Sequence, residues 1–195
     1  MQGWWVISYV VLWVVVTVLC ATTVALARQV GLLHLRLGPR GALELDDEGP
    51  ALGRALKPVR ATELSGDAIT IAARGEAQLL LFVSPGCPVC DQVLPAAAAL
   101  GRGGELTPYV LVDAEAAEAA TMLATMLEGR RVPAPVVAAA QLARDLEVPG
   151  TPYALVLDRE GIVRAKGTVN NLEQVEGLAD TALRRLAADG QARAA

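Results

Sequence analysis

The first part of the chain is a long apolar run. No charged side chain occurs from residue 4 to residue 27, a stretch of 24 positions, and about 20 apolar residues suffice to cross a bilayer core. Aromatic side chains crowd its N-terminal half, as they do at membrane interfaces: Trp4, Trp5, Tyr9 and Trp13. We therefore predict that residues 1–27 are a transmembrane anchor, with residues 4–27 in the membrane. We expect no cleavage, because the run is longer than a signal-peptide core and follows no basic residue.

The pattern changes after the apolar run. Turn formers and a short acidic run dominate residues 28–56, which predicts a juxtamembrane linker with little regular structure. From residue 57 to residue 190, short apolar runs typical of buried strands alternate with segments of helical spacing. We predict strands at 59–64, 68–72, 79–83, 107–112, 153–157 and 162–166, helices at 87–100, 114–128, 139–146 and 172–188, and an edge strand or loop at 132–138. This order predicts an α/β domain with a mixed sheet and helices on both faces.

A pair of cysteines lies where the apolar strand 79–83 is expected to give way to a helix. Cys87 and Cys90 form a C-x-x-C motif, and the chain has one other cysteine, Cys20, which we expect to pack as a small apolar residue in the membrane. A helix starting at Cys87 would direct its positive dipole end at the first sulfur and favour the reactive thiolate. Cys90, one turn further on, would be more buried and would resolve a mixed disulfide. The motif therefore predicts a dithiol/disulfide redox site with Cys87 and Cys90 as catalytic residues.

Two other uses of a C-x-x-C pair are disfavoured. A structural zinc site needs four ligands, whereas the only histidine, His34, lies beside the predicted membrane segment. A purely structural disulfide would constrain the unfolded chain little, because it closes so short a loop. We therefore expect neither a bound metal nor another cofactor.

The charges of the chain exclude one class of partner. The 17 basic and 21 acidic residues give a net charge of −4, and the two signs are interspersed after the anchor. Without a basic stripe, nucleic-acid binding is not expected.

A second motif is Gly150-Thr151-Pro152, directly before the predicted strand 153–157. Together with the C-x-x-C pair and Pro95 in the following helix, this order resembles the thioredoxin-like fold. The resemblance implies that residues 57–190 are a thioredoxin-like domain in which the Thr151–Pro152 bond is cis and faces the cysteines. It also implies that Thr151 and Pro152, with Pro88 and Val89 between the cysteines, shape a substrate groove.

Further stretches narrow the resemblance. Six stretches are similar to the MauD family of methylamine-utilisation proteins. They are the apolar anchor, residues 28–34, residues 38–43, Ser84-Pro85-Gly86-Cys87-Pro88-Val89-Cys90, Pro152-Tyr153-Ala154 and residues 161–167. That family is part of the membrane-tethered thioredoxin-like group that includes TlpA-type disulfide reductases. The resemblance implies an enzyme that helps to form or rearrange the disulfides of the methylamine dehydrogenase light subunit. It further implies a redox partner protein and a domain in the periplasm or otherwise outside the cytoplasm.

The sequence leaves the orientation and the direction of electron flow open. Arg28, Arg36 and Arg40 flank the anchor on its C-terminal side, and the positive-inside rule alone would place the domain in the cytoplasm. A tethered redox pair with few spare cysteines instead suits an oxidising compartment. Leu81 stands where thioredoxin has a buried acid, and Gly86 replaces its tryptophan. These departures from thioredoxin leave open whether the cysteine pair oxidises or reduces its substrate. The alternative functions are a disulfide reductase for cytochrome c maturation and a non-catalytic binding module.

Overall fold

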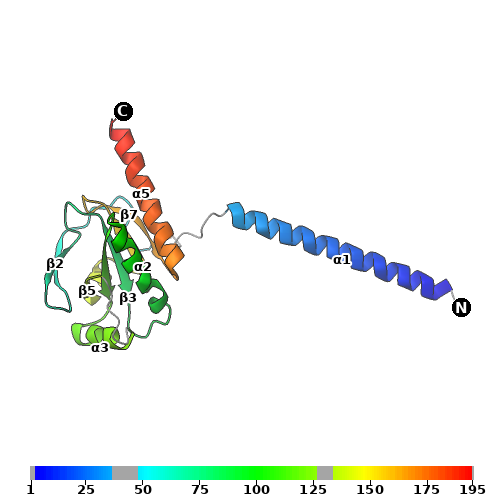
Figure 1. Ribbon diagram of the computed structural model, residues 1–195, viewed down its shortest axis with the longest axis horizontal. Helices are drawn as coiled ribbons and strands as arrows, with labels where there is room; N and C mark the ends of the chain where they lie inside the picture. The colour runs from blue at the N-terminus through cyan, green and yellow to red at the C-terminus, as the bar shows by residue number, and fades with distance from the viewer. Residues whose placement is uncertain (1–2, 37–47, 127–133, 195) are drawn as a thin grey trace. The chain divides into compact units, whose positions relative to one another are not determined.

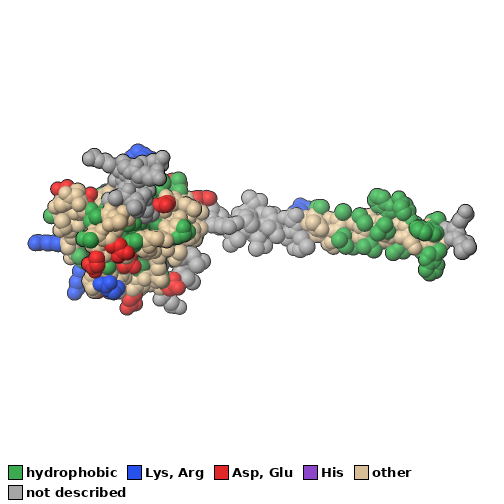
Figure 2. Space-filling model, turned by 90° about the horizontal axis from the view of Figure 1, so that it is seen from below, with side chains coloured by type: hydrophobic (Ala, Val, Ile, Leu, Met, Phe, Trp, Pro, Cys, Tyr) green, Lys and Arg blue, Asp and Glu red, His purple; other side chains and the backbone are tan. Residues whose placement is uncertain are grey.

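The N-terminal unit is a single long helix. The computed structural model describes residues 3–36, 48–126 and 134–194, and these fall into two compact units that divide near residue 38. Helix α1 (Gly3–Arg36) contains the predicted apolar segment. Residues Gly3–Val24 have a mean hydropathy of 2.3 and none of them is buried, and their length and composition suffice to cross a membrane. Figure 2 shows hydrophobic side chains all along this part of the helix.

The C-terminal unit is built on a mixed five-stranded sheet, in the order β5-β4-β3-β6-β7. Strands β3 (Gln78–Val83), β4 (Thr107–Val112) and β5 (Val136–Ala138) are parallel, and β6 (Tyr153–Leu157) and β7 (Val163–Thr168) are antiparallel to their neighbours. Strands β1 (Val59–Thr62) and β2 (Ala68–Ile71) form a separate hairpin. The predicted α/β fold class and the edge position of β5 are confirmed.

Helices cover both faces of the sheet, as Figure 1 shows. They are α2 (Cys90–Gly103), α3 (Ala116–Met126), α4 (Ala140–Asp145) and α5 (Leu172–Ala194). Residues of α2, α3 and α5 join one core, whereas α4 contributes Ala143 to the core on the opposite face. The end of the predicted helix 114–128 and the first residues of the predicted stretch 132–138 lie outside the described residues.

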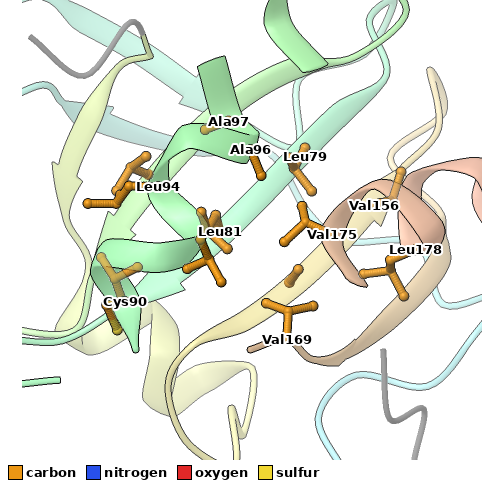
Figure 3. Packing of buried hydrophobic residues seen from close by; sticks show 14 of the residues in the cluster. Leu79, Leu81, Cys90, Leu94, Ala96, Ala97, Val156, Val169, Val175 and Leu178 are labelled. Carbon is orange, nitrogen blue, oxygen red and sulfur yellow. The ribbon is translucent and has the colours of Figure 1, made fainter. Parts of the chain in front are cut away.

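Strand β3 is buried on both faces, which explains its continuous apolar run. Leu79 and Leu81 point into the core shared with α2 and α5 (Figure 3), while Leu80 and Phe82 belong to the core on the other face. All its residues are buried. A strand in this position places whatever follows Val83 at the centre of one end of the sheet.

Residues 48–56, which were predicted as part of a linker, pack against the domain. The Gly53 amide donates to the Val163 carbonyl and the Leu56 amide to the Gly161 carbonyl, both at 2.9 Å. The Glu48 carbonyl accepts hydrogen bonds from Lys166 Nζ at 2.8 Å and from Tyr153 Oη at 3.2 Å. Lys166 is fully buried, so its ammonium group loses contact with water. The hydrogen bond to the Glu48 carbonyl offsets part of that loss. The segment is thus bonded to the sheet from Glu48 onward.

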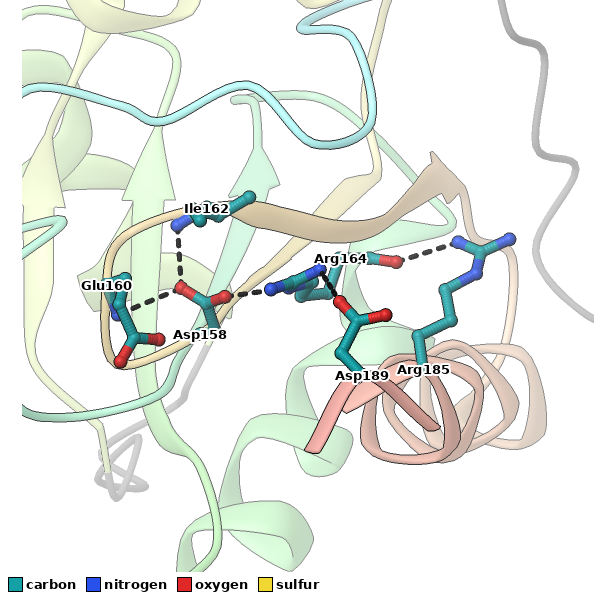
Figure 4. A network of polar contacts seen from close by, with 6 residues as sticks. All are labelled: Asp158, Glu160, Ile162, Arg164, Arg185 and Asp189. Atoms are coloured by element: carbon teal, nitrogen blue, oxygen red, sulfur yellow. Dashed lines mark hydrogen bonds and ion pairs between the residues drawn. The ribbon is translucent and has the colours of Figure 1, made fainter. Parts of the chain in front are cut away.

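A network of charges fastens the turn between β6 and β7 (Figure 4). Asp158, which is 1% exposed, accepts from the Glu160 and Ile162 amides at 2.9 and 2.8 Å and from Arg164 Nε at 2.7 Å. Arg164 also donates to Asp189 of α5 at 2.5 Å. Burial lowers the pKa of Arg164, but the hydrogen bonds and charges of Asp158 and Asp189 outweigh it and raise that pKa overall. The network therefore joins the turn to the last part of α5.

Candidate functional site

The two cysteines of the C-x-x-C motif form a disulfide in the loop after β3. Cys87 is half-buried, whereas Cys90 is 0% exposed and packs in the core with Leu81. The sequence predicts this difference in burial between the two cysteines. Cys87 is therefore the more accessible cysteine of the pair.

Helix α2 begins at Cys90, so the predicted start at Cys87 is wrong by three residues. The physical reason lies in the intervening residues: Cys87 precedes Pro88, and a residue before proline is disfavoured in the α conformation. The chain instead forms a turn, in which the Cys90 amide donates to the Cys87 carbonyl at 3.2 Å. Cys87 lies three residues before the first residue of α2, on the N-terminal side of the helix, where the dipole favours a thiolate. Pro95 lies inside α2, as predicted.

The loop before β6 faces the disulfide. The Thr151–Pro152 peptide bond is cis, which confirms the implication of the thioredoxin-like resemblance. Pairing of Phe82 with Tyr153 brings the start of β6 beside the end of β3. As a result, the Thr151 carbonyl oxygen lies 3.9 Å from Cys87 Sγ.

The four residues predicted to shape a groove differ in exposure. Pro88 is exposed, Val89 and Thr151 are half-buried, and Pro152 is buried. The Pro152 carbonyl accepts the Val169 amide at 3.1 Å, which ties the loop to the end of β7. Thr151 borders Cys87 directly, and Pro88 and Val89 lie in the turn between the cysteines.

Sequence reasoning missed Ser84 as a contact of the second loop. Ser84 Oγ lies 2.5 Å from Thr151 Oγ1, within hydrogen-bonding distance, across 67 positions of sequence. The local signal was a polar residue directly after a fully buried strand. Among the residues that the structure describes, no three His, Cys, Asp or Glu side chains are grouped so that they could hold a metal ion.

Solved structures share the fold of the C-terminal unit. StoA from Bacillus subtilis has a TM-score of 0.51 and 16% identity over 64% of this chain and 98% of its own. The thioredoxin domain of a thiol-disulfide oxidoreductase from Bacteroides vulgatus has a TM-score of 0.53 and 16% identity over 67% of this chain and 96% of its own. At this level of identity the similarity establishes the fold.

Sequence comparison establishes the family. A family model described as a thioredoxin-like domain matches residues 64–182. The methylamine utilization protein MauD of Paracoccus denitrificans is 32% identical over 91% of this chain and 88% of its own length. MauD of Methylorubrum extorquens is 33% identical over 88% of this chain and 83% of its own. The chain therefore belongs to the MauD family, and its domain after the apolar helix is thioredoxin-like.

Proposed function

We propose that the protein is a thiol–disulfide oxidoreductase that acts on other proteins. The observation that carries this proposal is the Cys87–Cys90 disulfide, with the more exposed sulfur beside the Thr151–Pro152 loop. A buried partner sulfur, a helix N-terminus and a facing cis-proline loop are a combination suited to exchange with an extended protein segment. Pro88, Val89, Thr151 and Pro152 would border that segment.

The reaction runs through a mixed disulfide. In the reducing direction, the Cys87 thiolate attacks one sulfur of a partner's disulfide, and the partner's other sulfur leaves as a thiolate. The Cys90 thiolate then attacks Cys87 Sγ, which forms the Cys87–Cys90 disulfide and releases the partner's second thiolate. Two electrons pass to the partner, and the reverse sequence oxidises a partner dithiol. A redox partner protein restores the starting state in either case.

We further propose where the protein works and on what. The apolar segment, residues 4–27, anchors the protein in the cell membrane with the domain in the periplasm or otherwise outside the cytoplasm, where protein disulfides persist. Relatives over about nine-tenths of the chain are named for methylamine utilization. This supports a role in forming or rearranging the disulfides of the methylamine dehydrogenase light subunit.

Trapping the mixed disulfide tests the function and identifies the substrate together. Full-length Cys90→Ser protein, expressed in cells growing on methylamine, keeps the attacking sulfur but loses the resolving one. We expect it to accumulate a reducible adduct with the light subunit, whereas Cys87→Ser forms none. Cys20→Ser is the matched control, because it removes the cysteine outside the pair and leaves exchange intact.

Other outcomes would contradict the proposal at different levels. An adduct with an apocytochrome c would indicate the cytochrome-maturation reductase instead. If Cys87→Ser and Cys90→Ser strains both kept full function and formed no adduct, the domain would be a binding module and not an enzyme.

A further inference from the structure

We propose that Ser84 is a positioning residue for the dithiol: its hydroxyl holds Thr151 so that the Thr151 carbonyl accepts a hydrogen bond from the reduced Cys87 thiol. This inference rests on the proposed function, and it assigns a role to a residue outside the C-x-x-C motif. When the disulfide is reduced, it no longer fixes Cys87, and the contact between Ser84 and Thr151 keeps the two loops of the site together.

Ser84 is bonded to both loops of the site. Its carbonyl accepts the Cys87 amide at 3.4 Å, within the cysteine loop. Its hydroxyl lies 2.5 Å from the Thr151 hydroxyl, in the cis-proline loop. Both side chains are half-buried, so water competes only in part for this hydrogen bond. Ser84 therefore connects the cysteine loop to the residue whose carbonyl faces the attacking sulfur.

The contact between Thr151 and Cys87 changes its nature on reduction. In the disulfide, Cys87 Sγ carries no hydrogen, so its 3.9 Å approach to the Thr151 oxygen is a van der Waals contact. Reduction adds two electrons and two protons to the sulfur pair and gives Cys87 an S–H group. At this distance a thiol can donate to the carbonyl, since hydrogen bonds of sulfur are longer than those of oxygen.

A carbonyl in this position favours the neutral thiol. A hydrogen bond to the protonated form raises the pKa of an acid, and the negative end of the carbonyl dipole opposes a thiolate. The N-terminus of α2 acts in the other direction. The Ser84–Thr151 hydroxyl pair decides how closely the carbonyl is held, and thus how far it offsets the helix.

The expected effect corresponds to one hydrogen bond between neutral groups. Losing such a bond changes an equilibrium by about two- to tenfold. We therefore expect a higher thiolate fraction of Cys87 when either hydroxyl is removed. The pKa of Cys87 would fall by a few tenths of a unit to about one unit.

The test uses full-length reduced protein in detergent, with Cys20→Ser in every sample so that only the pair can react. The pH dependence of alkylation of Cys87 by iodoacetamide gives its pKa, because Cys90 is buried. Ser84→Ala and Thr151→Val should each lower that pKa, and the double variant should lower it no further, because the two hydroxyls act as one contact. Thr151→Ser retains the hydroxyl and should restore the starting value. Ser65→Ala, at an exposed hydroxyl of the β1–β2 turn, is the matched control.

The remaining outcomes overturn the proposal. An unchanged or raised pKa in Ser84→Ala and Thr151→Val, with the usual reactivity of Cys87, would overturn this role of Ser84 and leave the proposed function standing. The same holds if the two effects were additive in the double variant. If Cys87 in the parent protein resisted alkylation throughout the pH range, both the proposed function and this inference would fail.

Discussion

The two ends of the five-stranded sheet are held by different kinds of contact. At the β6–β7 turn, the buried Asp158 carboxylate, Arg164 and Asp189 form a charged network that reaches α5. At the opposite end, the disulfide loop meets the cis-proline loop through a hydroxyl pair and a carbonyl–sulfur contact. The register of β3 with β6 separates the two ends, since Gln78 pairs with Leu157 and Phe82 with Tyr153.

The difference has a physical meaning. Full charges in a partly buried network act strongly on one another, and they fix a turn against a helix. The same charges beside a thiol would move its pKa by whole units. Contacts between neutral groups hold the dithiol end and leave the reactivity of Cys87 open to fine adjustment. The charged network and the disulfide thus lie at opposite ends of one sheet.

The largest effect on stability should come from Asp158→Ala. Removing this carboxylate leaves two amides and Arg164 without their buried partner, which should lower the free energy of unfolding by about 3 kcal/mol. The alkylation rate of Cys87 in the folded protein should not change, because the site lies at the other end. Urea unfolding and iodoacetamide kinetics measure the two quantities. A large change in alkylation would show that the two ends are coupled.

A smaller effect is expected from Gly49→Ala. Gly49 has φ of +69°, and an added Cβ would lie 2.6 Å from Tyr153 Oη. The left-handed backbone and the displaced Tyr153 hydroxyl together should cost about 2 kcal/mol of unfolding free energy. Gly53→Ala is the matched control, because Gly53 has φ of +78° and open space around it, so only the backbone cost remains. Equal losses in the two variants would contradict a tight contact between residue 49 and Tyr153.

The smallest effect is expected from Asp189→Ala. This carboxylate is 48% exposed, and Arg164 keeps its bond to Asp158 without it. Screening by solvent should limit the loss to about 0.5–1 kcal/mol in urea unfolding. Asp180→Ala is the control, because it breaks an exposed pair with Arg184 within α5 and should cost less still. A loss of unfolding free energy as large as that of Asp158→Ala would show that the bond between Arg164 and Asp189 stabilises the protein as much as Asp158 does.

Local pattern was enough to predict the central strands and to single out the cysteine pair. The apolar runs at 79–83 and 107–112 became the central parallel strands, because strands buried on both faces read as continuous apolar segments. The Thr-Pro dipeptide before Tyr153 indicated the cis bond through the thioredoxin-like resemblance. Cys87 and Cys90 were found because two thiols at this spacing have few other uses in so cysteine-poor a chain.

Contacts between distant segments escaped prediction. Lys166 lies at an alternating polar position of its strand, which suggests exposure, yet it is fully buried under the Glu48 carbonyl. The predicted linker residues 48–56 contain turn formers, but their amides bond to the turn before β7 and its first residue. Ser84 and Thr151 meet only because β3 and β6 are neighbours. In each case the partner is a backbone or hydroxyl oxygen far away in sequence, so the local pattern does not identify it.

The complete burial of Cys90 has a kinetic consequence. In the proposed reaction, a mixed disulfide at Cys87 is released by a neighbouring sulfur of the same chain, so the release rate does not depend on protein concentration. Glutathione and other small thiols in solution can compete for the first step, at the half-exposed sulfur. They cannot reach Cys90 directly, so its sulfur stays available to attack the mixed disulfide in the proposed reaction.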